Sequence, residues 1–193
     1  PNANTIWKSN RSTISPSQPA VLTWDNGNGI IFKKTIRLDE EYMFNIEQTI
    51  INNTSEEIKI YPYGLINRTG LPKLSGLFIL HEGPIGVMND RVKEIDYDDL
   101  EDNNKISEKS KTGWIGITDK YWLAAVVPQQ GESFKSTFLY KESFKANYIL
   151  NSPTVIKPSS SNSNKVRLFV AAKEVETIDA YAANQNIEKL DLT

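Results

Sequence analysis

The sequence predicts a mainly β protein: a single sandwich domain over residues 1–193, with a helical C-terminal segment at about 174–190. Three observations lead to this prediction. Apolar and polar residues alternate with period two over several short segments, turn residues separate these segments, and helical spacing appears only near the end of the chain. The Ser/Asn tract at 158–164 is the only candidate linker, and too few residues follow it to fold alone.

The first strands are predicted to form a hairpin. Residues 21–24 and 30–38 carry strand patterns, and the intervening Asn26-Gly27-Asn28-Gly29 tolerates the positive φ angles of a tight turn. Residues 42–50 alternate again and end at an Asn-Asn turn, with three apolar residues expected to point inward: Phe44, Ile46 and Ile50. The next strand is predicted at 58–61, where Pro62 indicates an edge or a bulge.

The segment 113–128 predicts two buried strands joined by the polar turn Thr118-Asp119-Lys120, with Pro128 closing the second strand. It contains Trp114, Tyr121 and Trp122. With Trp24, these aromatic residues could line a sugar- or peptide-binding face. We expect the alternative, in which Trp114 and Trp122 face the interior, because apolar strand residues usually form core.

Three loops, three strands and a helix complete the prediction. Loops are expected at 67–76 and 158–164, and an exposed excursion at 96–111. Strands are expected at 134–140, 148–156 and 165–171. Thr177 is a candidate cap for the final helix. Its apolar residues recur near helical spacing at Val175, Ile178, Ala182, Ile187 and Leu190.

Composition excludes several classes of function. The net charge of -2 and the interspersed signs offer no basic surface for nucleic acid. The chain has no cysteine, which excludes disulfides and thiolate metal sites. No apolar run reaches the length of a membrane span. Because the chain starts at Pro1, we expect a fragment or a processed form whose signal or anchor has been removed.

No catalytic constellation is predicted. His81 is the only histidine, so a serine triad, a histidine zinc site or a two-histidine acid/base pair cannot be built from this chain. The neighbouring carboxylates Asp98-Asp99 and Glu101-Asp102 lie in a polar segment with nothing to raise a pKa, and we interpret them as a solvated loop. The sequence therefore predicts a non-enzymatic protein without catalytic, cofactor-binding or metal-binding residues.

Several segments, taken in order, resemble the periplasmic domain of the bacterial YidC-type membrane protein insertases. They are the hairpin at 26–38, residues 42–53 and the C-terminal run Arg-Leu-Phe-Val-Ala-Ala-Lys-Glu at 167–174. Tyr181 and Leu190-Asp-Leu192 follow that run. The most specific part of the resemblance is a structural signature of six residues: Gly113, Trp114, Asp119, Tyr121, Trp122 and Pro128.

The resemblance implies a galactose mutarotase-like β-supersandwich with a C-terminal α-helix, facing the periplasm from the inner membrane. It implies a scaffold or interaction module in the insertion and folding of membrane proteins, with or beside the Sec translocon. Implied partners are accessory subunits of the translocon, nascent membrane proteins and the protein's own transmembrane domain. The chain departs from the family in extent, because the membrane spans and the earliest strands are expected to be absent. Candidate docking residues of the helix are Ile178, Tyr181, Ala182 and Ile187.

Two other functions remain open at this stage. Aldose mutarotases share the supersandwich fold but use histidines with a glutamate, whereas this chain has His81 alone. A carbohydrate-binding module or a non-catalytic relative of the mutarotases would need an exposed Trp or Tyr beside carboxylates on a concave face. A peptide-binding periplasmic chaperone would need a long apolar groove.

Overall fold

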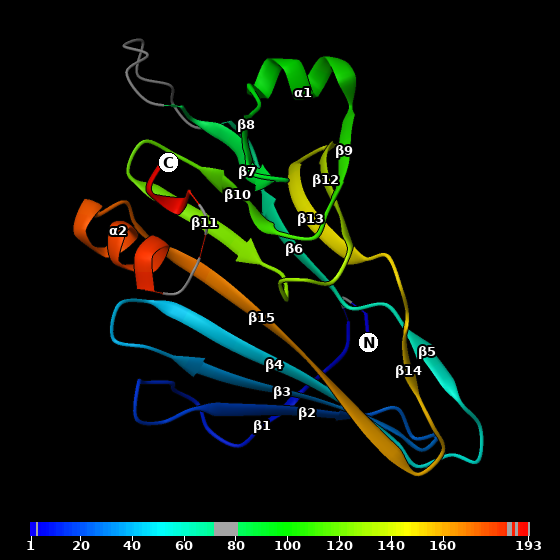
Figure 1. Ribbon diagram of the computed structural model, residues 1–193. Coiled ribbons are helices and arrows are strands. Elements are labelled where there is room, and N and C mark those ends of the chain that lie inside the picture. Colours follow the sequence, from blue (N-terminus) through cyan, green and yellow to red (C-terminus); the bar gives the residue numbers. More distant parts are fainter. Residues whose placement is uncertain (3, 72–80, 185–186, 188, 193) are drawn as a thin grey trace. The chain divides into compact units, whose positions relative to one another are not determined.

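The structure, a computed structural model, describes residues 1–2, 4–71, 81–184, 187 and 189–192 (Figure 1). Its strands pair in antiparallel sheets, which confirms the mainly β fold. Internal contacts divide the chain into two compact units. The first unit contains Pro1–Pro62 and Ser152–Leu168, and the second contains Tyr63–Asn151 and Phe169–Thr193. The single-domain organisation stays a prediction.

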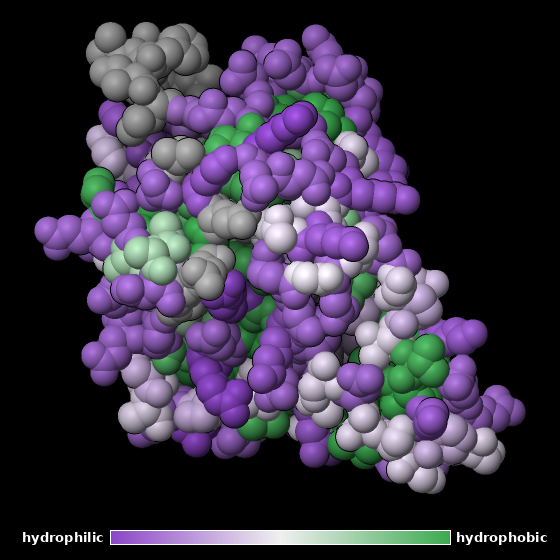
Figure 2. All heavy atoms as spheres, viewed as in Figure 1, coloured by the Kyte–Doolittle hydropathy of each residue, from purple (hydrophilic) through white to green (hydrophobic). Residues whose placement is uncertain are grey.

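The first unit is built on a sheet with the strand order β1-β2-β3-β4-β15. A separate two-stranded ribbon pairs β5 with β14 (Figure 1). Figure 2 shows a small hydrophobic area over this ribbon, where Val155 is exposed. The bounds of these strands are β1 Lys8–Ser9, β2 Ala20–Asp25, β3 Ile30–Leu38, β4 Met43–Asn52, β5 Ile58–Ile60, β14 Thr154–Ile156 and β15 Ser160–Ala172.

The predicted β2–β3 hairpin is present. Gly27 and Gly29 in its turn have φ angles of 74° and 84°, the conformation that glycine adopts without steric cost. Burial departs from the predicted alternation, because Phe44, Ile46 and Ile50 are only half-buried. Most residues on both faces of β3 and β4 are half-buried. The alternation of apolar and polar residues in these strands therefore does not separate a buried face from an exposed one.

Asn52 fixes the end of β4 to β14. Its buried side-chain amide donates to the backbone carbonyls of Ile156 at 3.1 Å and of Glu56 at 2.8 Å. Its Oδ1 accepts from the backbone N–H of Thr54 at 3.0 Å. The side chain thus satisfies backbone groups that the β4–β5 turn leaves unpaired.

The second unit contains two sheets that pack face to face. One has the order β6-β13-β12-β9, and the other continues from β15 as β11-β10-β7-β8. Helix α1 crosses the ends of β9 and β12. The bounds are β6 Tyr63–Arg68, β7 Gly83–Met88, β8 Arg91–Glu94, α1 Tyr97–Asn103, β9 Lys105–Ser110, β10 Gly113–Thr118, β11 Trp122–Val127, β12 Phe134–Tyr140 and β13 Phe144–Leu150.

Strand β10 is the centre of this unit, since all six of its residues are buried. Trp114 is its largest side chain and is fully enclosed. Gly113 has a φ of 103°, and a Cβ at this position would lie 1.8 Å from the carbonyl oxygen of Val87. Only glycine therefore allows β7 to approach the start of β10 so closely. The buried aromatic residues of the facing sheet are Phe134, Phe138, Phe144 and Tyr148.

Two predicted loops are wrong, and a third is shorter at its start than expected. The expected excursion at 96–111 is helix α1 followed by β9, and Tyr97 and Leu100 anchor the helix by pointing inward at a three-residue spacing. In the loop expected at 67–76, Asn67 and Arg68 still belong to strand β6, residues 69–71 lie outside any strand as predicted, and 72–76 lie outside the described residues. The polar tract at 158–164 is mostly strand, because β15 begins at Ser160. Backbone pairing there overrides the low strand propensity of Ser and Asn.

Two further boundaries differ from the prediction. The strand expected at 148–156 is two strands, because Ser152 and Pro153 interrupt it between β13 and β14. The final helix α2 spans Val175–Asn184, and a short 3₁₀ turn follows at Leu190–Leu192. The N–H of Ile178 donates to the carbonyl of Glu174, so Thr177 lies inside the helix and does not cap it.

Helix α2 contacts the end of β15 within the second unit. The rings of Tyr181 and Phe169 meet edge to face at 5.6 Å between centroids. Ile178 and Ile187 are also buried, whereas Ala182 is partly exposed. Among the described residues, no helix is long and apolar enough to cross a membrane.

Candidate functional site

The second unit carries a cleft of about 300 Å³ between the end of β6 and the β10–β11 hairpin. Its lining residues come from β6, from β10 and β11, and from β15. They are Ile66, Asn67, Arg68, Thr69, Ile117, Asp119, Trp122, Leu123, Ala124 and Val170. We call it the Arg68–Asp119 cleft after the two charged residues that line it.

These two lining residues form an ion pair with each other. The Arg68 guanidinium donates through Nη1 to Oδ2 of Asp119 at 2.7 Å, and both side chains are about three-quarters buried. Strand β6 ends at Arg68, whereas Asp119 follows β10 in the turn that Trp122 closes by accepting from the Asp119 N–H. The pair therefore joins two elements that are 51 residues apart in sequence.

Hydrogen-bonding capacity remains unused around this pair. Arg68 Nε and Asp119 Oδ1 are buried and have no hydrogen-bond partner in the described part of the chain. The ammonium of Lys173 likewise has no partner there, whereas the Tyr97 hydroxyl lies near enough to Asp119 for a hydrogen bond with this carboxylate to help raise the pKa of Tyr97. Buried polar atoms are rarely left unsatisfied, so water or a polar ligand would complete the hydrogen bonding of Arg68 Nε and the Lys173 ammonium.

The charges near the cleft influence two further ionisable groups. Burial raises the pKa of Tyr97 above its usual range, and Arg68 opposes that shift while Asp119 and Glu82 add to it. Burial also lowers the pKa of the Lys173 ammonium, against the opposing charges of Glu82 and Asp119. Tyr97 therefore stays a neutral hydroxyl at physiological pH, able to donate or accept a hydrogen bond.

The predicted burial of Trp122 is wrong. Its side chain is 60 % exposed at the rim of the cleft, and Tyr121 beside it is 64 % exposed. In β11 the alternate residues Leu123, Ala125 and Val127 are buried, which places Trp122 on the opposite face. Trp114 faces the interior as expected. Side chains alternate between the two faces of a strand, and this alternation in β11 is the feature that places Trp122 outward while Trp114 of β10 faces the interior.

The other singled-out residues lie apart from the cleft. Gly113 forms the close approach to Val87, and Pro128 accepts a hydrogen bond from Gln130 after β11 ends. His81 Nε2 lies 3.1 Å from the carbonyl of Pro84, and its Nδ1 lies 3.8 Å from Asp96. His81 is therefore engaged at the start of β7 and does not line the cleft.

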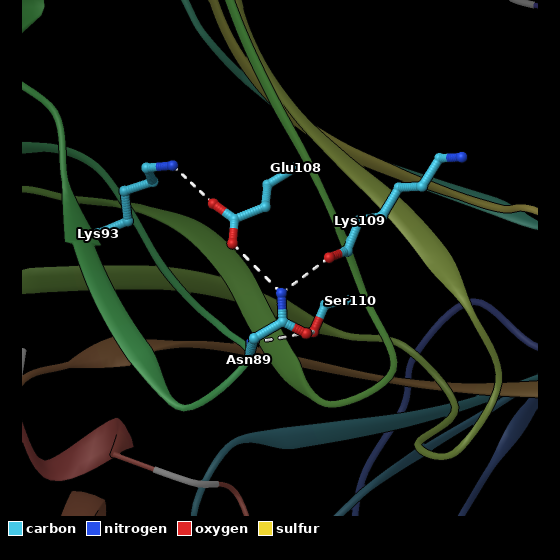
Figure 3. Close-up of polar contacts among 5 residues, drawn as sticks. All are labelled: Asn89, Lys93, Glu108, Lys109 and Ser110. Atoms are coloured by element: carbon cyan, nitrogen blue, oxygen red, sulfur yellow. Dashed lines mark hydrogen bonds and ion pairs between the residues drawn. The ribbon is translucent and has the colours of Figure 1, made fainter.

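A second polar cluster ties the β7–β8 turn to β9 (Figure 3). The Lys93 ammonium donates to Glu108 at 2.6 Å, and the Asn89 side-chain amide donates to Glu108 at 3.3 Å and to the Lys109 carbonyl at 2.9 Å. Ser110 accepts from the Asn89 N–H at 3.0 Å. All five residues take part in mutual contacts, so we interpret this cluster as structural.

Within the ranges that the structure describes, no group of three or more His, Asp or Glu side chains could hold a metal ion. The cleft offers a cation, a carboxylate, a hydroxyl and an aromatic ring, which suit binding of a polar molecule. His81 does not line it, and no nucleophile with an adjacent base occurs among the residues that do.

Comparison with known proteins identifies the family of the chain. The family model described as "YidC periplasmic domain" matches residues 1–193. The chain belongs to the YidC periplasmic domain family. This confirms the resemblance that Gly113, Trp114 and the C-terminal segment carried in the sequence.

Two YidC relatives illustrate the match. The membrane protein insertase YidC of Pelagibacter ubique (strain HTCC1062) is 42% identical over 193 residues, which are 100% of this chain and 34% of the relative. The corresponding protein of Rickettsia prowazekii (strain Madrid E) is 42% identical over 198 residues, covering 99% of this chain and 35% of the relative. The chain thus spans about a third of the length of these YidC proteins.

A solved structure shares the fold of this YidC-family domain. A galactose mutarotase related enzyme from Lactobacillus acidophilus superposes with a TM-score of 0.59 at 9% identity, covering 89% of this chain and 74% of that chain. The likeness confirms the mutarotase-like fold class predicted from the resemblance. At this identity it says nothing about activity, because one fold supports many functions.

Proposed function

We propose that this chain is a non-catalytic domain of a membrane protein insertase, where it serves as a scaffold and interaction module on the periplasmic side of the inner membrane. The observation that carries the proposal is the family match over residues 1–193, together with 42% identity to proteins named as insertases. The proposed role is binding and scaffolding, which requires no chemical step. His81, the candidate for acid/base chemistry, does not line the Arg68–Asp119 cleft.

The proposed partners are nascent membrane proteins, accessory subunits of the Sec translocon and the protein's own transmembrane domain. Edge strands such as β8 and β9, each at the end of its sheet, can pair with an added strand of a partner. The test is affinity purification of the full-length protein from solubilised membranes, with and without residues 1–193. Recovery of translocon subunits or newly made membrane proteins only with the domain would support the proposal, and equal recovery would contradict it.

Helix α2 is proposed to fix the C-terminal segment onto the sandwich through Ile178, Tyr181, Ala182 and Ile187. The burial of Ile178 and the contact between Tyr181 and Phe169 support this role. Ile178→Ala should lower the free energy of unfolding by about 2–4 kcal/mol, since it removes buried methylene groups. Val175→Ala, on the same helix but 71 % exposed, is the matched control and should change stability little. Equal effects of the two substitutions would contradict the docking role.

The Arg68–Asp119 cleft supports a second candidate function, binding of a saccharide or another polyol. Trp122 is exposed beside a carboxylate, the arrangement in which an aromatic ring packs on the apolar face of a sugar while charged groups bond its hydroxyls. A glycan array and tryptophan fluorescence titrations test this function. Binding that disappears in both Trp122→Ala and Asp119→Asn would support it, and an array without ligands would remove it.

A further inference from the structure

One face of the β6-β13-β12-β9 sheet has an unusual distribution of charge. The strand register places three rows of facing side chains across the four strands. In the order β6, β13, β12, β9, the rows are Tyr63, Ile149, Lys135, Lys109; then Leu65, Asn147, Thr137, Ser107; then Asn67, Lys145, Leu139, Lys105. We call these twelve positions the lysine face.

The lysine face is the side of the sheet that does not form the core. Alternate residues of the same strands, among them Phe134, Phe138 and Tyr148, are buried against the other sheet of this unit. A hydrogen bond of 3.0 Å between the hydroxyls of Ser107 and Thr137 confirms that neighbouring strands share this face. Figure 3 shows the Lys109 side chain pointing away from the cluster that holds Glu108.

The face carries four lysines and no carboxylate, although the chain as a whole has a net charge of -2. No carboxylate lies within 4.0 Å of these four ammonium groups in the part of the chain that the structure describes. Lys109 and Lys135 even face each other directly across β9 and β12. Like charges in facing positions destabilise a sheet, so this arrangement is retained at a cost in stability.

Exposed apolar side chains lie on the same face, beside the lysines. Tyr63 is 61 %, Leu65 51 % and Ile149 39 % exposed, and all three lie on β6 and β13. A surface that combines lysines with a tyrosine and aliphatic groups has the composition of sites at the membrane interface. There the ammonium groups meet phosphates and the apolar groups enter the headgroup layer.

We infer that the lysine face binds the surface of an anionic phospholipid bilayer. The inference rests on the proposed function in one respect: an insertase domain is held next to a membrane, so weak contacts at its surface suffice for binding. Lys105, Lys109, Lys135 and Lys145 supply the attraction. Tyr63, Leu65 and Ile149 contact the region of the lipid headgroups. The shared face of neighbouring strands lets these side chains approach the same membrane surface together.

Sedimentation with lipid vesicles tests the inference directly. The chain of residues 1–193 is mixed with vesicles of phosphatidylcholine containing about a third phosphatidylglycerol, or with phosphatidylcholine alone, at low and high salt. Binding is expected only to the anionic vesicles and should weaken at high salt, because exposed charges are screened. Each lysine near an anionic surface contributes up to about fivefold in affinity. Absence of binding at low salt would overturn the inference.

Substitutions distinguish vesicle binding through the lysine face from a general effect of positive charge. Replacing the four lysines with glutamine should lower vesicle binding at least about tenfold. The matched control replaces Lys8, Lys33, Lys59 and Lys157, which lie in the other unit, and should lower it only slightly. Equal losses in the two variants would overturn the assignment. Because Lys109 and Lys135 repel each other, Lys109→Gln alone should leave the melting temperature unchanged or higher, so a folded variant is available.

The contribution of the apolar side chains to vesicle binding is tested with a matched pair of substitutions. Ile149→Ser should weaken vesicle binding, whereas Val155→Ser, at a similar exposure of 42 % on a strand of the other unit, should not. Polyglutamate and free glycerophosphate serve as competitors. If polyglutamate binds as well as the vesicles, the face belongs to an acidic protein partner; if millimolar glycerophosphate displaces the vesicles, it is a simple phosphate site. Both results would overturn the inference and leave the purification test of the insertase function unaffected.

Discussion

Arg68 at the end of β6 and Asp119 after β10 form an ion pair of 2.7 Å that joins the two sheets of the second unit. Both groups are largely removed from water, and each is the other's only charged partner within 4.0 Å among the described residues. Their interaction is therefore a point where loss of one partner leaves the other buried and uncompensated.

Arg68→Met should destabilise the protein by about 2–4 kcal/mol, because the Asp119 carboxylate would lose its countercharge in a partly buried position. Arg37→Met is the matched control. Arg37 lies 3.8 Å from Glu47 in a more exposed pair, and its loss should cost less than about 1 kcal/mol. Urea unfolding measures both variants. Equal midpoints would show that the Arg68 pair contributes no more than a surface contact.

The two tryptophans of the 113–128 segment should respond differently to substitution. Trp114→Ala should lower the free energy of unfolding by about 3–5 kcal/mol, since a large side chain is removed from a closed core. Trp122→Ala should cost less than about 1 kcal/mol, because most of its ring is already in water. Thermal unfolding followed by circular dichroism compares them. A large loss of stability in Trp122→Ala would place its ring in the core.

Asn52→Ala should destabilise the first unit by about 2–3 kcal/mol. The substitution leaves the Ile156 carbonyl and the Thr54 N–H without their side-chain partner. Asn53→Ala, at the adjacent exposed position, should have little effect. Hydrogen exchange adds a local measurement, because the amide protons of the β5–β14 pair should exchange faster only in Asn52→Ala. Unchanged protection there would contradict a clamping role for Asn52.

Glu108 predicts a pH dependence of stability. Its hydrogen bond with Lys93 lowers the carboxyl pKa, and the charges of Lys93 and Arg91 add to that shift. A lowered pKa in the folded state means that the unfolded chain binds protons more readily. The stabilisation by Glu108 is therefore present above a pH of about 4.3, the unfolded-state pKa, and is lost as the pH falls through the pKa of the folded state. Wild type should therefore exceed Glu108→Gln at neutral pH, by at most about 1 kcal/mol.

Urea midpoints of wild type and Glu108→Gln, measured between pH 7 and pH 3, test this dependence. The two midpoints should converge in acid. Glu57→Gln, at an exposed position, serves as the control and should follow wild type throughout. A difference for Glu108→Gln that persists or grows in acid would have the wrong sign for a depressed carboxyl pKa.

Elements with strong local signals were predictable from the sequence. The β2–β3 hairpin follows from its Asn-Gly turn, and β10 with β11 follows from the apolar runs on either side of Asp119. Helix α1 was missed because only Tyr97 and Leu100 mark its buried side within an acidic segment. The start of β15 was missed because Ser and Asn there are held by pairing with neighbouring strands, which local composition does not show.

The cleft was less predictable than the fold. Asp119 was singled out as part of a family signature, but no pattern pointed to Arg68, whose partner lies 51 residues away. Pairings of this kind depend on how β6 packs against β11, where a Cβ at Gly64 would approach Val126 to 3.3 Å. A single sequence records neither the contact nor the unused hydrogen-bonding atoms beside it.

The division of β15 between the two units has a consequence for how the chain folds as it is made. The first unit needs both its N-terminal strands and residues up to Leu168, whereas nearly all of the second unit's strands lie between Tyr63 and Asn151. Synthesis from the N-terminus therefore delivers β6 through β13 while β4 still lacks its neighbour. Until Ser160 and the residues after it emerge, β4 presents an unpaired edge that can recruit a foreign strand.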